Sequence, residues 1–256
     1  MKRRVTIAYG DHPEQFGHLY LPTDADGPVP VVMLIHGGYW SADFQLTLAT
    51  SMAVELSRRG VAAWNVEYRR VGAGGGWAET SSDIETALGA VATLLPEQSA
   101  VPLDIDDVRI VGHSAGAQLA VWLAGQKECA VRPTRVLSQA GALDLASRAS
   151  ARVGGPALEA LFGVSYADDP QTYRDASPLH RVPTGVPTVC IHGVDDAQVP
   201  IQASRSYVEA ARLHGDRAVL WEIPNEGHNA FLDRTTRSWA STLDAVLGDD
   251  PWDRAR

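Results

Sequence analysis

The chain alternates short, continuous apolar runs with longer stretches in which apolar residues recur at helical spacing. Residues 31–35 (Val-Val-Met-Leu-Ile) are apolar throughout and follow Pro30, which is typical of a strand buried on both faces. Comparable runs recur along the chain at residues 61–66, 108–111, 136–138, 186–191 and 218–223. Strands that alternate with helices need right-handed crossovers and form a mostly parallel sheet, so the pattern predicts an α/β fold.

The stretches between these runs are predicted to be helices. Those with an amphipathic pattern are residues 46–58, 82–95, 115–125, 201–213 and 229–247. Asp83, or a serine beside it, is predicted to cap the second of these helices, because short polar side chains bond the free amides of a first turn. Two early runs, residues 5–9 and 16–20, flank a turn-rich stretch and are predicted to form an antiparallel hairpin at the sheet edge.

Two segments depart from this rhythm. Residues 141–185 contain several glycines and prolines and no strong strand, and we interpret them as a small helical, cap-like excursion over the carboxyl edge of the sheet. Residues 103–107 contain three aspartates and are predicted to be a solvated turn before the next strand. Neither segment has the features of a linker, so residues 1–256 are predicted to form one domain.

Composition and charge narrow the classes of partner. The 22 basic and 31 acidic side chains give a formal net charge of −9, which would repel a phosphate backbone, so nucleic acid is not expected as a partner. The sequence contains no run of about 18 apolar residues, which a membrane span would need. Residues 5–10 are too short and too polar for the core of a signal peptide. We therefore expect a cytoplasmic protein. The two cysteines lack metal-ligand spacing, so no metal site is predicted.

The clearest candidate for chemistry is Ser114, in the sequence Gly112-His113-Ser114-Ala115-Gly116. An apolar strand leads into these residues and a helical stretch follows them. A strand that turns sharply into a helix places its central side chain at a strained tip, and it needs small residues on both sides because the backbones there come very close. The helix also aims its N-terminal amides at the same point. Ser114 is therefore predicted to be a nucleophile.

A serine nucleophile needs a base, and the base needs a carboxylate to orient it. Residues 189–191 lead into a loop that contains Asp195 and Asp196, and the last strand leads into a loop that contains His228. Both loops leave the carboxyl ends of predicted parallel strands, as Ser114 does, so the side chains are expected to meet. The spacing Gly-x-x-Asp-x-x-Val-Pro favours Asp196, with Asp195 as the alternative.

Three other histidines receive structural interpretations. His113 precedes the serine and is expected to point away from the substrate side. His36 and His192 each end a strand before a glycine, and hydrogen bonds to the backbone of the following loop account for them. His228 is preferred as the base because of its order in the chain and its position after the last strand.

An anion site is predicted in the loop that follows residues 31–35. The sequence His-Gly-Gly-Tyr-Trp at residues 36–40 contains two glycines, which allow backbone N–H groups to face the serine. We expect the amides of Gly38, Tyr39 and Ala115 to form an oxyanion hole, in which one donor is typically worth about 3–4 kcal/mol of transition-state stabilisation.

Together these residues resemble the α/β-hydrolase superfamily over residues 30–247. The form His-Gly-Gly-x-Trp is similar to that of the arylformamidase (kynurenine formamidase) group and related bacterial carboxylesterases. The resemblance implies an eight-stranded, mostly parallel sheet with helices on both faces, a triad of Ser114, Asp196 and His228, and no cofactor. Tyr39 stands where lipase-type relatives carry a third glycine. The tyrosine side chain is expected to narrow the mouth of the site and to offer a surface for an aromatic acyl or leaving group.

Candidate substrate contacts follow from position in the chain. Trp40 comes directly after the predicted anion loop. Trp77 follows a glycine-rich loop, and it is expected either to lie at the rim of the pocket or to pack on Trp40. Leu143 is one of several apolar residues in residues 141–185, and the others are Leu145, Leu158, Leu161 and Phe162. These residues either line the acyl pocket or form the buried faces of the helices of this segment.

The sequence therefore predicts a serine esterase that cleaves carboxylic esters of small molecules through an acyl-enzyme on Ser114. An arylformamidase that hydrolyses N-formylkynurenine or a related activated amide is the nearest alternative, because it would use the same triad. A noncatalytic binding protein of the hydrolase fold is a more distant one. The expected partner is a small-molecule ester or amide; no membrane partner is expected, and a homodimer is left open.

Overall fold

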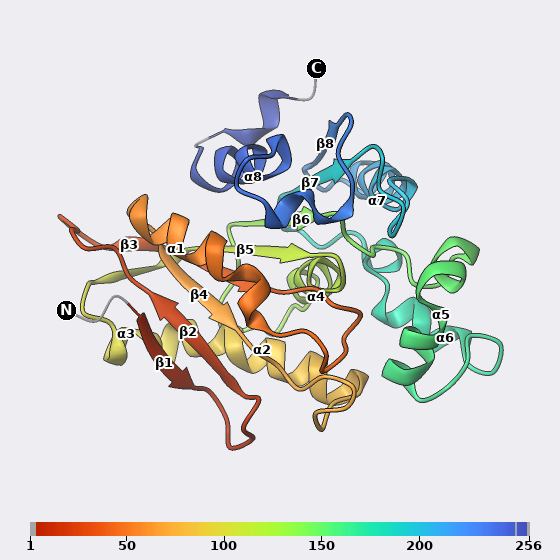
Figure 1. The fold of residues 1–256 in the computed structure, drawn as a ribbon, viewed down its shortest axis with the longest axis horizontal. Coiled ribbons are helices and arrows are strands. Elements are labelled where there is room, and N and C mark those ends of the chain that lie inside the picture. The colour runs from red at the N-terminus through yellow and green to blue at the C-terminus, as the bar shows by residue number, and fades with distance from the viewer. Residues whose placement is uncertain (1–3, 249, 255–256) are drawn as a thin grey trace.

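The computed structural model describes residues 4–248 and 250–254, which form an α/β fold around a central sheet of eight strands (Figure 1). The strands are β1 Arg4–Ala8, β2 Phe16–Tyr20, β3 Val29–Ile35, β4 Ala62–Val66, β5 Leu103–His113, β6 Arg135–Gln139, β7 Thr188–Gly193 and β8 Ala218–Ile223. Their order in the sheet is β1-β2-β4-β3-β5-β6-β7-β8. Strand β2 runs antiparallel to both neighbours, and the pairings from β4 to β8 are parallel. The mostly parallel sheet and its edge hairpin are therefore confirmed.

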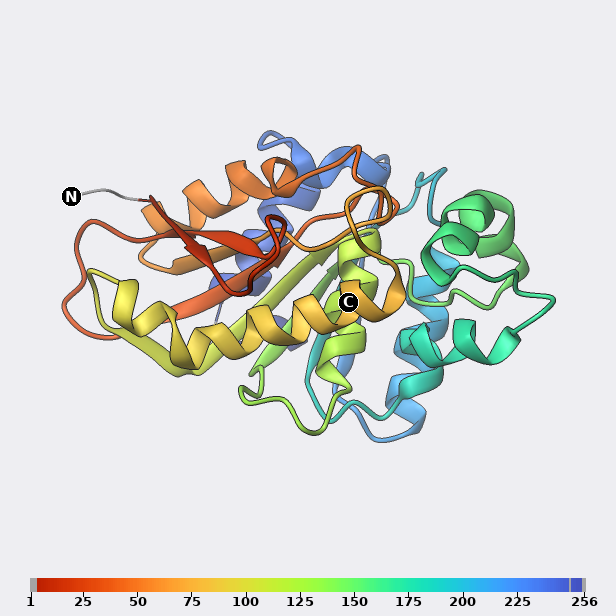
Figure 2. The same ribbon diagram turned by 90° about the horizontal axis from the view of Figure 1, so that it is seen from below.

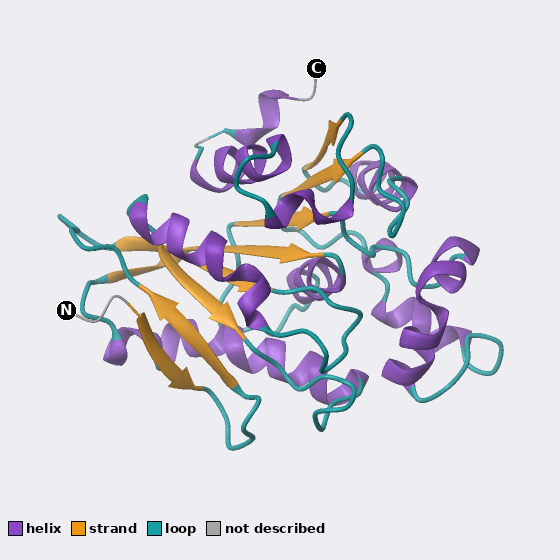
Figure 3. Ribbon diagram, in the orientation of Figure 1, coloured by secondary structure: helices purple, strands orange, loops and turns teal. Residues whose placement is uncertain are grey.

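Helices cover both faces of the sheet (Figures 2 and 3). The main ones are α1 Thr50–Arg58, α2 Trp77–Thr93, α4 Ala115–Ala124, α7 Gln202–Leu213 and α8 Arg237–Leu247, and shorter ones are α3 Leu95–Gln98 and η1 Leu46–Ala49. Helices α2, α4 and α7 contribute to one apolar cluster, and α1 and α8 to the other. None of the helices in the described ranges combines the length and the apolar character that crossing a bilayer requires.

The central strands are buried on both faces, because alternate side chains enter the two clusters. In β3, Val31, Met33 and Ile35 face the cluster of α2, α4 and α7. Val32 and Leu34 face the cluster of α1 and α8. Successive strand residues point to opposite faces, so a strand covered on both sides needs an uninterrupted apolar run.

Helix α2 begins five residues before its predicted start, and Asp83 does not cap it. Gly76 is the N-cap, and Glu79 Oε2 accepts a hydrogen bond from the Gly76 amide at 3.1 Å. Asp83 lies inside the helix with no exposed surface, and its carboxylate accepts hydrogen bonds from the backbone and the guanidinium of Arg69. The prediction was wrong because the partner of Asp83 lies on another segment, which local sequence does not reveal.

Strand β5 starts earlier than predicted, so residues 103–107 belong to a strand and are not a solvated turn. Leu103 pairs with Val29, and after a bulge the register resumes with Val108 opposite Val31. The bulge lets the polar residues of this stretch remain exposed or half-buried while the strand stays paired on both sides of it.

The helix predicted over residues 229–247 is divided into two elements, η3 His228–Leu232 and α8 Arg237–Leu247. Thr236 caps α8, because its side chain accepts a hydrogen bond from the amide of Trp239. The break leaves His228 in a short 3₁₀ turn at the end of the sheet, while α8 packs back onto the sheet.

The chain between β6 and β7 is helical and contains α5 Arg148–Phe162, α6 Pro170–Ala176 and η2 Pro178–Arg181. Figure 1 shows α5 and α6 beyond the end of the sheet toward which β5 points. Because β5 is one of the parallel strands, this is their carboxyl end, where the loops with the candidate site residues also lie.

Candidate active site

Ser114 lies at the turn between β5 and α4, in a strand-turn-helix arrangement. Its backbone has φ 55° and ψ −117°, a conformation that residues other than glycine rarely adopt. Its neighbours must be small, since a Cβ on Gly112 would lie 2.2 Å from the carbonyl oxygen of Gly116, and one on Gly116 would lie 2.1 Å from that of Ile35. This close packing holds the Ser114 side chain at the carboxyl end of the sheet.

Asp196 and His228 come together at the same edge, from the loops after β7 and β8. His228 Nδ1 lies 2.7 Å from Asp196 Oδ2, and the carboxylate side chain has no exposed surface. A carboxylate oxygen accepts, so Nδ1 carries the hydrogen and Nε2 of the neutral ring is left as an acceptor. Asp195, the alternative, is exposed to solvent. The structure therefore brings His228 to Asp196 and not to Asp195.

Four donors surround the carboxylate of Asp196. Oδ1 accepts from the amides of Gln198 and Val199, both at 2.8 Å. Oδ2 accepts from His228 and also lies 3.2 Å from Nε2 of His192. Burial alone raises the pKa of this carboxyl, but the hydrogen bonds from the two histidines and the Val199 amide outweigh burial and hold the pKa well below its usual range. Asp196 is therefore ionised at neutral pH.

His113 packs on His228, a contact that the sequence did not reveal. The two rings lie 4.8 Å apart, and His113 Nε2 donates to the carbonyl oxygen of His228 at 3.0 Å. Burial, together with the neighbouring His228, lowers the pKa of His113 to about 4, so its ring is neutral near pH 7. His113 supports the backbone of His228 and lies outside the lining of the cavity beside Ser114.

The loop after β3 presents backbone amides next to Ser114. Gly38 and Tyr39 have positive φ angles of 116° and 55°, which wind the loop tightly. Among the described residues, no acceptor is assigned to the N–H groups of Gly38, Tyr39 or Ala115. A Cβ on Gly37 would lie 3.0 Å from the Cβ of Ser114, so the loop passes close to the elbow. Free amides in this position are suited to bind a negatively charged oxygen.

A buried ion-pair network holds the start of that loop. His36 Nδ1 lies 2.7 Å from the carbonyl oxygen of Gly37, and its Nε2 lies 2.8 Å from Glu67 Oε1. The ring of His36 stacks on Tyr68 with centroids 4.6 Å apart, and Arg70 Nε lies 3.2 Å from Glu67 Oε1. The bond from His36 to loop backbone was expected from the sequence. The part played by Glu67 and Arg70 was missed, because both come from the segment after β4.

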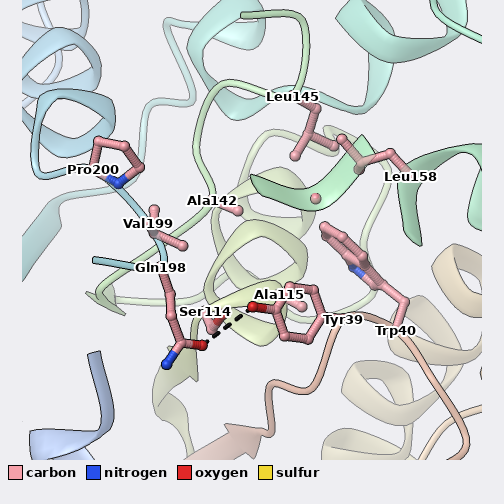
Figure 4. A pocket seen from close by; sticks show the side chains of 11 residues that line it. Tyr39, Trp40, Ser114, Ala115, Ala142, Leu145, Leu158, Gln198, Val199 and Pro200 are labelled. Atoms are coloured by element: carbon pink, nitrogen blue, oxygen red, sulfur yellow. Dashed lines mark hydrogen bonds between the residues drawn. The ribbon is translucent and has the colours of Figure 1, made fainter. Parts of the chain in front are cut away.

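A cavity that is partly open to solvent lies beside Ser114 (Figure 4). None of its lining residues is charged, and most are apolar: Tyr39, Trp40, Ser114, Ala115, Ala142, Leu145, Gly154, Leu158, Gln198, Val199 and Pro200. Figure 4 shows Ser114 and Ala115 at one end, and Leu145 and Leu158 at the opposite end. The cavity is therefore an apolar space that begins at the elbow and ends on side chains from the segment between β6 and β7.

Hydrogen bonds hold the two aromatic residues of the cavity. Trp40 Nε1 donates to Gln118 Oε1 at 3.0 Å, and this bond is buried. The Tyr39 hydroxyl donates to Gln198 Oε1 at 3.2 Å, in an exposed position beside Ser114 (Figure 4). This second bond connects the loop after β3 with the loop after β7.

Two residues that the sequence suggested as substrate contacts are not part of the cavity lining. Trp77 is the first residue of α2 and packs against Trp122 and Phe162, with ring centroids 5.0 and 5.8 Å away. Leu143 is completely buried in the core, and Leu161 is nearly so. Apolar character predicts that such side chains are covered, but not whether a substrate or the protein covers them.

The arrangement is suited to acyl transfer, since it combines a hydroxyl at a strained turn, an imidazole held by an ionised carboxylate, and free amides. Within the described part of the chain no hydrogen bond links Ser114 Oγ to His228, and such contacts often tighten only when substrate binds. In residues 4–248 and 250–254, no group of three or more His, Cys, Asp or Glu side chains could hold a metal ion.

Comparison with known proteins gives a family and a curated relative. Residues 18–210 match the family model described as BD-FAE. The probable isoprenylcysteine alpha-carbonyl methylesterase ICMEL1 of Arabidopsis thaliana is 25% identical, over 96% of this chain and 56% of its own length. This chain therefore spans a little more than half the length of that relative.

Solved structures show the fold. A bifunctional GH43-CE protein of Bacteroides eggerthii has a TM-score of 0.82 and 21% identity, over 96% of this chain and 35% of its own. Esterase B from Lactobacillus rhamnosis has a TM-score of 0.80 and 19% identity, over 95% of this chain and 84% of its own. These similarities confirm the α/β-hydrolase fold. None of the named proteins is described as an arylformamidase, so the resemblance to that group gains no support.

Proposed function

Because the chain belongs to the BD-FAE family, we propose that it is a serine esterase that cleaves carboxylic esters of small molecules. The observation that carries this proposal is the hydrogen bond of 2.7 Å between His228 and Asp196, at the sheet edge where Ser114 sits on the elbow. A carboxylate on Nδ1 leaves Nε2 to accept a proton, which a weak nucleophile such as serine requires.

In the proposed reaction, the Ser114 hydroxyl attacks the ester carbonyl while His228 accepts its proton. The amides of Gly38, Tyr39 and Ala115 donate to the oxyanion that forms. His228 then returns the proton to the leaving alcohol, and the acyl group remains on Ser114. Water attacks this acyl-enzyme with His228 again as the base. His228 then returns the proton to Ser114 Oγ as the bond to the acyl carbon breaks, and the carboxylic acid is released.

The acyl group is proposed to occupy the apolar cavity. His228 must reach the oxygen of the leaving alcohol, and it is not among the residues that line the cavity, whereas Ser114 and Ala115 are. The part of the ester remote from His228 is the acyl group, so this part fits the uncharged cavity. Leu145 and Leu158 lie at the end opposite Ser114 (Figure 4), which favours short acyl chains.

Residues 141–185 are proposed to act as a small cap over the acyl group, within a single domain of residues 1–256. Ala142, Leu145, Gly154 and Leu158 come from this segment and line the cavity. A roof of apolar side chains excludes water from the acyl group while the alcohol side stays accessible.

The test combines esterase activity with labelling of the nucleophile. We expect hydrolysis of p-nitrophenyl acetate and butyrate, and a fluorophosphonate that stops it by forming an adduct on Ser114. Ser114→Ala is expected to lose the adduct and at least about 10⁴-fold in kcat. Ser82→Ala, at an exposed serine on α2, is the matched control and is expected to keep both. An adduct elsewhere, or an unchanged esterase rate in Ser114→Ala, would overturn the proposal.

A further inference from the structure

His192 is a second histidine on the carboxylate of Asp196, and no step of the proposed reaction uses it. It lies near the end of β7 with a side chain that has no exposed surface, and its Nε2 lies 3.2 Å from Asp196 Oδ2. The sequence suggested only a bond to loop backbone. That bond is present, since Nε2 also lies 2.9 Å from the carbonyl oxygen of Val199, and the contact with Asp196 is additional.

The partners of His192 determine which ring nitrogen carries hydrogen. Both neighbours of Nε2, a carboxylate oxygen and a carbonyl oxygen, are acceptors, so Nε2 is protonated and donates to them. Nδ1 lies 2.8 Å from Oγ of the buried Ser204 on α7, whose hydroxyl donates to it. A ring that carries its hydrogen on Nε2 and accepts at Nδ1 therefore satisfies both contacts.

The other titratable groups near His192 are neutral or already paired. Glu222 of β8 stands opposite His192 in the sheet register, and its carboxylate forms an exposed ion pair with Arg205 of α7 at 2.7 Å. His113 of β5 is neutral because burial lowers its pKa. Asp196 is therefore the charged group that the Nε2–H of His192 faces most directly.

The hydrogen bonds of Asp196 leave its carboxylate a single orientation. Two backbone amides hold Oδ1. His228 donates to Oδ2, and Nε2 of His192, which donates to the Val199 carbonyl, lies 3.2 Å from the same oxygen. Removing His192 would take this second donor away from the buried carboxylate and would let the carboxylate turn away from His228.

We propose that His192 is a positioning residue, whose Nε2–H contact keeps Asp196 Oδ2 aimed at Nδ1 of His228. This inference rests on the proposed function, because the orientation of Asp196 affects turnover only if His228 acts on Ser114. His192 touches no reacting atom and lies outside the cavity. Its loss is therefore expected to lower kcat and to leave KM unchanged.

Two substitutions of His192 distinguish the contact of Nε2 with Asp196 from the hydrogen bond of Nδ1 with Ser204. Asparagine keeps a polar group near Nδ1, within reach of Ser204, but does not reach Asp196, whereas the longer glutamine can donate to Asp196. We expect kcat for p-nitrophenyl butyrate to fall about 10- to 100-fold in His192→Asn, the range for one hydrogen bond to a charged group. His192→Gln is expected to recover most of this loss.

Ser204→Ala is the matched control for these variants. It removes the hydrogen bond to Nδ1 of His192 and leaves the bond from Nε2 to Asp196. We expect a lower melting temperature, because a buried polar atom loses its partner, with kcat nearly unchanged. A loss of kcat in Ser204→Ala as large as in His192→Asn would mean that packing around the ring, and not the bond to Asp196, governs turnover.

A double-mutant cycle distinguishes positioning from a general loss of structure. If His192 acts through Asp196, then adding His192→Asn to Asp196→Asn lowers the residual kcat no further. A purely structural role makes the two losses multiply. Multiplied losses, or an unchanged kcat in a folded His192→Asn variant, would overturn the inference.

A proton NMR resonance tests the same inference without any turnover. The proton between His228 Nδ1 and Asp196 Oδ2 gives a signal far downfield, which is expected to shift or broaden in His192→Asn and to persist in His192→Gln. If the signal behaves in this way while no ester is hydrolysed, then the proposed function fails and the orienting contact stands. An unchanged signal in folded His192→Asn contradicts the positioning role itself.

Discussion

Ser114 stands between two regions that are built in opposite ways. The loops after β3, β7 and β8 carry buried polar groups, each held by partners: Asp196 accepts from four donors, and His36 is held by Glu67. The facing cavity wall, much of it from the segment between β6 and β7, is apolar and is held by packing. The polar region fixes single atoms through directional bonds, whereas the apolar region fixes only a shape.

The difference follows from what each region must do. Acyl transfer needs a hydroxyl, an imidazole and amide donors in a defined geometry, and a displacement of about 1 Å can cost about 10²-fold in rate. An acyl chain needs only a volume from which water is excluded. We therefore expect changes in the polar region to lower turnover or stability for every substrate. Changes in the apolar region are expected to alter which ester is preferred.

The largest effect is expected at Asp196. Asparagine keeps the size of the side chain but puts a neutral amide where His228 meets a carboxylate, so kcat is expected to fall about 10⁴-fold with little change in KM. Asp195→Asn is the matched control, because Asp195 is exposed, and it is expected to retain nearly full activity. Steady-state kinetics with p-nitrophenyl butyrate measures both variants. A larger loss at Asp195 would reverse the assignment of the acid.

The next effect is expected in the stability of the network behind the loop after β3. Glu67 lies between His36 and Arg70, with almost no exposed surface. Glu67→Gln removes the negative charge that pairs with Arg70 and is expected to lower the free energy of unfolding by about 3 kcal/mol. Glu222→Gln breaks the exposed pair with Arg205 and is expected to cost less than about 1 kcal/mol. Urea unfolding measures both, and equal losses would show that burial does not distinguish the two pairs.

A smaller effect is expected in the pH dependence of stability. Unfolded His113 binds a proton near pH 6.5, whereas in the folded protein its pKa is lowered to about 4. Between these values the unfolded state binds more protons, so stability falls as the pH drops through this window, by at most about 3 kcal/mol from this group. His113→Gln keeps a donor for the carbonyl of His228 and is expected to show a shallower fall. Urea unfolding at about pH 7 and about pH 4.5 measures how far the free energy of unfolding falls in each protein. An equal fall in the wild type and in His113→Gln would contradict the prediction.

The smallest effect is expected at the apolar end of the cavity. Leu158→Ala removes the isopropyl group opposite Ser114 and lengthens the space for the acyl chain. The ratio of kcat/KM for the hexanoate ester to that for the acetate ester is expected to rise about tenfold, since each buried methylene is worth about 0.8 kcal/mol. Leu213→Ala, at a leucine that is 78% exposed, is the control. A uniform fall for all chain lengths would mean that Leu158 supports the catalytic geometry instead.

Much of the candidate site was predictable because a strand and the loop that follows it are neighbours in the chain. Ser114, Asp196 and His228 each follow an apolar run, and the carboxyl ends of parallel strands share one edge of the sheet. The preference for Asp196 over Asp195 came from local spacing, and the hydrogen bond to His228 agrees with it.

The contacts that support the site were not predictable, because they join distant segments. Glu67 meets His36 across 31 positions, and His113 meets His228 across 115. No periodicity or motif marks such pairs, and each side chain has an ordinary structural explanation when considered alone. Trp77 shows the same limit, since its place after a glycine-rich loop left both the pocket rim and packing on Trp40 open, whereas its ring packs against Trp122 and Phe162.

The exposed hydrogen bond between Tyr39 and Gln198 has a kinetic consequence. Its net free energy is about 1 kcal/mol, and exposed side chains change rotamer within nanoseconds. The bond therefore breaks and re-forms many times during one catalytic cycle, because enzymes typically turn over at about 1–10³ s⁻¹. Opening of this bond is therefore too fast to limit turnover, so the hydrogen bond between Tyr39 and Gln198 does not set kcat.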